Sequence, residues 1–137
     1  MKVQRAESPA TLAGHDAARD FFATCFTGAE ANRNELLWVA HVDDQARCIH
    51  LGRFADGRTG AVDLPVRQII ADAARLGSAG VLLAHNHPSG DATPSARDCQ
   101  ATRKLARAAE AIDLVVVDHL IFARAGKCSS LRRMGLL

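Results

Sequence analysis

The chain has 137 residues, enough for one compact domain with a real hydrophobic core and too few for two ordinary domains. Hydrophobic residues make up 48% and charged residues 23%, a composition that argues against both a disordered chain and a membrane protein. The formal net charge of +2 is too small to indicate a nucleic-acid partner through bulk electrostatics.

The four cysteines are scattered and include no Cys-x-x-Cys pair; they are Cys25, Cys48, Cys99 and Cys128. This spacing argues against a structural zinc knuckle and against a thioredoxin-like redox site. No apolar segment with a cleavage site opens the chain. We therefore expect a cytoplasmic protein with reduced thiols and no membrane partner.

The first element predicted along the chain is a helix. Ser8-Pro9 is a suitable helix start, and apolar residues then recur at helical spacing until Gly28 ends the pattern. Residues 29–34 are expected to form a polar linker. The apolar residues 35–42 predict a buried strand, which a turn connects as a hairpin to residues 47–54.

The second half alternates helices and strands. Residues 65–76 predict a helix that ends at Gly77, and residues 81–84 predict a short buried strand. A helix over residues 95–110 and strands over 114–122 and 128–131 complete the chain. The pattern predicts a single-domain α/β protein over residues 1–137, with a mixed β-sheet and flanking helices.

The segment Ala84-His-Asn-His-Pro-Ser-Gly-Asp-Ala-Thr-Pro-Ser-Ala-Arg-Asp98 contains the strongest chemical signal. His85 and His87 are two apart on a predicted strand, so both imidazoles should face one side while Asn86 points away. Asp98 lies one turn into the next helix and can face them, beside Ser95. Two histidines and one carboxylate leave a fourth tetrahedral position for water, as is typical of catalytic zinc.

Bound zinc lowers the pKa of its water from about 15.7 to roughly 7, and a hydroxyl such as that of Ser95 can stabilise an oxyanion. A simpler interpretation exists for each part. Ser95 and Asp98 also match a capping box that starts the helix, and isolated histidines are usually core or surface residues. The combination at this spacing favours the metal site.

This segment resembles the JAMM (MPN+) metalloprotease motif, in which His85-x-His87 is followed after seven residues by Ser95-x-x-Asp98. The fuller segment looks like the RadC branch of that family. The similarity extends from about Ser8 to Arg133 and includes Asn34-Glu35-Leu-Leu-Trp-Val and Asp118-His119-Leu-Ile. It implies a JAMM/MPN, cytidine-deaminase-like α/β fold and a Zn²⁺ cofactor.

The resemblance also assigns roles to residues. It implies His85, His87 and Asp98 as metal ligands, Glu35 as the catalytic base and Ser95 as the stabiliser of the tetrahedral intermediate. From the residues alone, a glutamate ahead of a strand is usually a surface residue. His119 is either a partner that orients a ligand or a histidine bonded inside the fold, and Asp91 is expected to be a turn residue.

Two departures from the RadC pattern stand out. No room for the family's helix-hairpin-helix region precedes the first predicted helix, so we expect a bare JAMM domain. The ending Cys128-Ser-Ser-Leu-Arg-Arg differs from the usual one, which leaves the form of the last strand open.

The leading hypothesis is a zinc-dependent hydrolase of peptide or isopeptide bonds. The second is a non-catalytic module, linked to DNA repair, that binds protein or DNA; four basic residues on the helix over residues 95–110 motivate it: Arg97, Arg103, Lys104 and Arg107. The third is hydrolysis of a non-peptide amide or amidine. The sequence does not identify the substrate or the oligomeric state.

Overall fold

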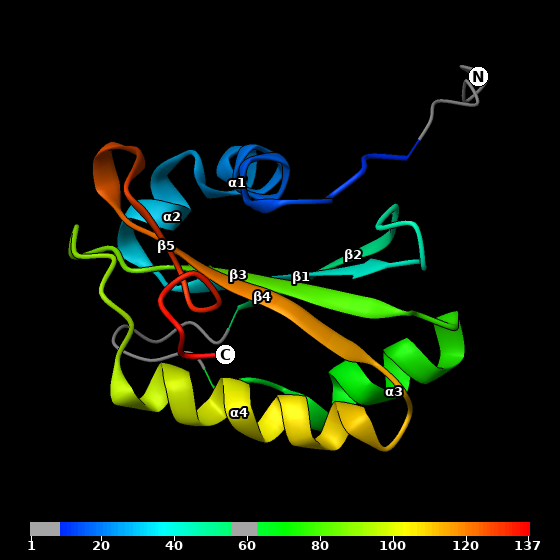
Figure 1. Cartoon of the computed structure of the whole chain (residues 1–137). Helices are drawn as coiled ribbons and strands as arrows, with labels where there is room; N and C mark the ends of the chain where they lie inside the picture. Colours follow the sequence, from blue (N-terminus) through cyan, green and yellow to red (C-terminus); the bar gives the residue numbers. More distant parts are fainter. Residues whose placement is uncertain (1–8, 56–62) are drawn as a thin grey trace.

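The computed structural model describes residues 9–55 and 63–137 (Figure 1). Three-layer packing is visible, with helices on both faces of a β-sheet. The elements, in chain order, are α1 (His15–Ala23), a 3-10 turn (Thr24–Phe26), α2 (Ala29–Arg33), β1 (Leu36–Val42), β2 (Cys48–Ala55), α3 (Val66–Leu76), β3 (Gly80–Asn86), α4 (Ala96–Glu110), β4 (Val115–Phe122), a second 3-10 turn (Arg124–Gly126) and β5 (Cys128–Ser130).

The sheet is mixed and its strand order is β2-β1-β3-β4-β5. β1 pairs antiparallel with both β2 and β3, and β3 pairs parallel with β4. A parallel pair needs a long crossover connection, and α4 provides it. α1 and α2 lie on one side of the sheet, whereas α3 and α4 lie on the other (Figure 1). The expected mixed sheet with flanking helices is confirmed.

The core has two parts because the sheet is covered on both faces. Every residue of β3 is buried, which explains its continuous apolar run. Leu83 packs in the same cluster as Ile69 of α3 and Leu105 of α4, whereas Leu82 packs in the same cluster as Phe22 of α1. Alternate residues of one strand therefore contribute to opposite layers. No helix in the described ranges is long and apolar enough to cross a bilayer.

The beginning of the chain differs from the expectation. The first helix begins at His15, and Thr11, ahead of it, forms an antiparallel bridge with Arg47 beside the β1–β2 hairpin. Leu12 N donates to Ala46 O, and Cys48 N donates to Ala10 O. These bonds to a distant segment prevent Pro9 from starting a helix; Ser8 lies outside the described residues.

The expected linker over residues 29–34 is also wrong. It contains the short helix α2, which follows Gly28. Gly28 has a positive φ of 95°, as Gly14 before α1 has a φ of 88°. Five residues are too few for periodicity to reveal a helix. The open question about the last strand is resolved, because Cys128–Ser130 pairs antiparallel with β4.

Candidate metal centre

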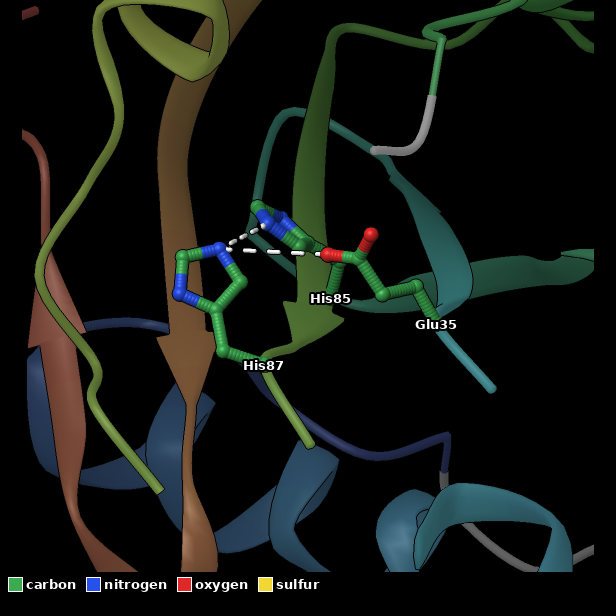
Figure 2. Close-up of side chains that lie close together, drawn as sticks. All are labelled: Glu35, His85 and His87. Carbon is green, nitrogen blue, oxygen red and sulfur yellow. Dashed lines mark hydrogen bonds and ion pairs between the residues drawn. The ribbon is translucent and has the colours of Figure 1, made fainter. Parts of the chain in front are cut away.

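The site begins where β3 ends. His85 is the penultimate residue of β3 and His87 directly follows the strand, so their side chains project to the same side of the sheet. The two Nε2 atoms lie 3.0 Å apart (Figure 2). His85 is almost fully buried, whereas the side chain of His87 remains 17% exposed. Of the two histidines, His87 is therefore the one that solvent can reach.

Asp98 reaches the histidines from the first turn of α4. Its Oδ1 lies 3.4 Å from His85 Nε2, and its Oδ2 lies 3.3 Å from His87 Nε2. The same carboxylate accepts a hydrogen bond from Ser95 N at 2.8 Å, while Ser95 Oγ accepts one from Asp98 N at 3.0 Å. The capping box is therefore present, and it holds the Asp98 carboxylate toward the histidines rather than competing with that role.

Glu35 comes from the chain segment directly ahead of β1. In the β1–β3 pairing, Leu37 lies opposite His85, so continuing the antiparallel register by two residues brings Glu35 opposite His87. Glu35 is 4% exposed, and its Oε1 lies 3.9 Å from His87 Nε2. One ligand atom each from Glu35, His85 and His87 fall within 4.8 Å of one another (Figure 2).

A chain of hydrogen bonds fixes the tautomer of His85. Thr102 Oγ1 donates its single proton to the carbonyl of Asp98 at 2.7 Å, so the same oxygen must accept from His119 Nδ1, also at 2.7 Å. In neutral His119, Nε2 then has no proton and accepts from His85 Nδ1 at 2.7 Å. The lone pair of His85 is consequently on Nε2, which faces His87 and Asp98.

The tautomer of His87 follows from one backbone contact. Its Nδ1 donates to the carbonyl oxygen of Asp91 at 2.9 Å, which leaves the lone pair of the neutral ring on Nε2. The side chain of Asp91 accepts from both the amide and the hydroxyl of Thr93, as expected of a turn residue. When both rings are neutral, two nitrogen lone pairs and a carboxylate converge, and this arrangement can hold a cation.

The protonation states of the site agree with this arrangement. Burial lowers the pKa of His85 to about 4, and burial also holds the pKa of His119 well below its usual range. The protonated form of His87 can donate from Nε2 to Asp98, and this hydrogen bond raises the pKa of His87. Burial alone would raise the pKa of Asp98, but the hydrogen bond from His87 and the neighbouring His85 outweigh it and hold this pKa below its usual range. At neutral pH the site therefore contains neutral His85 and His119 and an ionised Asp98.

The donor set fits a small divalent metal ion. Bonds of about 2.0–2.1 Å in a tetrahedral site place neighbouring ligand atoms ~3.3 Å apart. The two Nε2 atoms lie 3.0 Å apart, His85 Nε2 lies 3.4 Å from Asp98 Oδ1, and His87 Nε2 lies 3.3 Å from Asp98 Oδ2. Nitrogen and carboxylate donors with three protein ligands match the type of site that keeps one position open.

Thr102 is the contributor that the sequence interpretation missed. It lies one helical turn after Asp98 on the same face of α4 and is fully buried against His119. Its position four residues after Asp98 on a predicted helix could have indicated that it lies near the site. Asp118, by contrast, lies away from the site: it accepts from Ser130 Oγ and Arg132 N and so ties the C-terminal residues to β4.

We expect His119→Ala to lower metal affinity roughly 10- to 100-fold, because His85 Nδ1 loses the acceptor that fixes its ring. Competition between the protein and a chromophoric zinc chelator measures this change. His119→Gln should retain more of the affinity, since its side-chain carbonyl can accept from His85. His41→Ala removes another buried histidine of the sheet, bonded to Ser78, and serves as the control. Equal zinc affinity in His119→Ala and wild type would contradict the role.

The comparison with protein families concerns nearly the whole chain. A family model described as the RadC-like JAB domain matches residues 14–136, which is nearly the whole chain.

Proposed function

The chain belongs to the RadC-like JAB domain family, and from that membership we propose that it is a zinc-dependent hydrolase of peptide or isopeptide amide bonds. One observation carries the proposal: His85, His87 and Asp98 converge within 3.0–3.4 Å of one another, with buried Glu35 beside them.

Two carboxylates adjoin the histidines, and their distances support different roles. Each oxygen of Asp98 lies 3.3–3.4 Å from one histidine Nε2, close to the spacing expected of neighbouring ligands of one zinc ion. Glu35 Oε1 is further away, at 3.9 Å from His87 Nε2, a separation that leaves Glu35 beside the open position. We therefore assign Asp98 as the third ligand and Glu35 as the base, although Glu35, His85 and His87 also form a group that can hold a metal.

His85, His87 and Asp98 would hold the zinc ion, which would supply a Lewis acid to make bound water more acidic and the scissile carbonyl more electrophilic. Glu35 takes the proton of the attacking water and passes it to the leaving amine, so that it ends the cycle ionised again. Ser95 Oγ accepts from Asp98 N, and its own O–H remains to be donated to the developing oxyanion.

The test uses the protein loaded with one equivalent of zinc. Cleavage of a peptide library and of isopeptide-linked lysine substrates is followed by mass spectrometry, with small amides and amidines tested in parallel. Release of new amino termini or free lysine amines supports the proposal, whereas turnover of small amides alone supports the non-peptide alternative. A protein that binds no zinc when the metal is supplied contradicts both.

A non-catalytic module that binds DNA is the second candidate. The supporting observation is that Arg103, Lys104 and Arg107 are all exposed on α4. Binding through phosphate contacts would give a DNA mobility shift that weakens as salt increases and that is lost when these three residues are replaced. Absence of any shift at low salt would count against this candidate.

A further inference from the structure

The side chain of Asn86 lies on the opposite side of β3 from its neighbours His85 and His87, and it is 4% exposed. We propose that Asn86 is a positioning residue for Glu35: its amide fixes the chain segment that carries this carboxylate. The assignment rests on the proposed function, in which Glu35 is the base.

The amide of Asn86 makes three hydrogen bonds, all to the backbone of one segment. Nδ2 donates to Ala31 O at 2.7 Å and to Asn34 O at 3.0 Å, and Oδ1 accepts from Leu36 N at 2.7 Å. Two of the partners, Asn34 and Leu36, are the residues on either side of Glu35. The amide therefore holds the backbone immediately before and after the carboxylate.

This contact replaces the sheet pairing at the point where the pairing stops. The register between β1 and β3 runs as far as Leu37 opposite His85. Beyond it, the side chain of Asn86 takes the place of a neighbouring strand for Leu36 N. It also supplies donors for carbonyls at the C-terminal end of α2, which has only five residues. One side chain of the strand that carries the proposed metal ligands thus holds the backbone on both sides of Glu35.

The physical consequence separates metal binding from catalysis. The ring orientations of His85 and His87 are set by hydrogen bonds to His119 and to the carbonyl of Asp91, and neither of these bonds involves Asn86. Without the amide, the segment from α2 to β1 loses three hydrogen bonds, and the backbone that carries Glu35 is held less firmly. Misplacement of a catalytic group by about 1 Å can cost roughly 100-fold in rate.

The experiment compares Asn86→Ala, Asn86→Ser, Glu35→Gln and the double variant of Asn86→Ala with Glu35→Gln. Zinc affinity is measured by chelator competition, and the visible spectrum of the cobalt(II)-substituted protein reports the surroundings of the open metal position. We expect Asn86→Ala to keep zinc affinity and KM, to lose roughly 10- to 100-fold in kcat, and to shift the cobalt spectrum as Glu35→Gln does. Asn86→Ser should show the smaller loss, and the double variant should be no slower than Glu35→Gln.

Several outcomes overturn the inference. The first is a wild-type kcat and cobalt spectrum in metal-loaded Asn86→Ala. The second is a loss of kcat in the double variant that equals the sum of the two single losses in free energy. The third is failure of both Asn86 variants to fold with zinc supplied, which would assign the amide to stability alone. His41→Ala, at the other end of β1, controls for removal of a buried polar group. If wild type shows no hydrolysis, the proposed function fails, but the cobalt spectra still test whether Asn86 acts through Glu35.

Discussion

Glu35→Gln is expected to keep its zinc and to lose about 10²- to 10⁴-fold in the rate of amide hydrolysis, the usual contribution of a positioned general base. Glutamine has the same shape as glutamate but cannot take a proton from water. The residue is 4% exposed and lies beside His87. Among the described residues, Asp98 is the other carboxylate within 4 Å of these histidines, and the proposal assigns it to the metal. Zinc content by elemental analysis and kcat/KM for the best substrate of the cleavage screen give the two readings.

The matched control for this prediction is Glu30→Gln. Glu30 is five residues earlier, on α2, where it pairs with Arg53 at the surface. Its replacement should leave both zinc content and rate unchanged. If Glu35→Gln instead releases zinc, then Glu35 is a ligand together with His85 and His87, and the proposed base is wrong.

The order of helices and strands could be predicted from the sequence, because a sheet covered on both faces has strands that are almost entirely apolar. β1 and β3 are mostly apolar and buried. The residues expected to end α3 and to start α4 do so: Gly77 is left-handed with φ 68°, and Ser95 caps α4. These signals are local, so one chain segment is enough to interpret them. The predicted bounds of these elements are confirmed to within one or two residues.

The predictions that were wrong or missed concern residues whose contacts lie far along the chain. Ala10 and Leu12 are hydrogen-bonded to Cys48 and Ala46. The sequence around Pro9 gives no sign of these distant partners. Thr102 acquires its role only because α4 packs its buried side chain against His119 of β4. Tertiary contacts of this kind leave no periodic mark on the sequence.

Glu35 is an intermediate case. A family resemblance singled it out, whereas its own surroundings in the sequence favoured a surface residue. The strand register supplies the physical reason that was missing: Leu37 opposite His85 places Glu35 opposite His87, on the side of the sheet where Leu37 and His85 are buried. Period-two alternation therefore links two residues about fifty positions apart once the pairing of β1 with β3 is known.

His85→Ala and Asp98→Asn are each expected to weaken zinc binding by about 10²- to 10³-fold, one ligand's share of the roughly 10–16 kcal/mol that a four-ligand site provides. Both variants should lose hydrolysis at zinc concentrations that saturate wild type. The thermal midpoint gives a second reading, because a metal that binds only the folded state raises it. Zinc should therefore stabilise wild type and His41→Ala but not these two variants at the same concentration.

Asp98→Asn also separates the two roles of this side chain. Asparagine can still accept from Ser95 N, as Asp98 does at 2.8 Å, so the cap of α4 is largely retained while the charge that faces His85 and His87 is removed. A metal-free melting temperature close to wild type combined with lost zinc affinity identifies Asp98 as a ligand. If Asp98→Asn binds zinc as wild type does, the carboxylate is only a cap, and the ligand set must instead include Glu35.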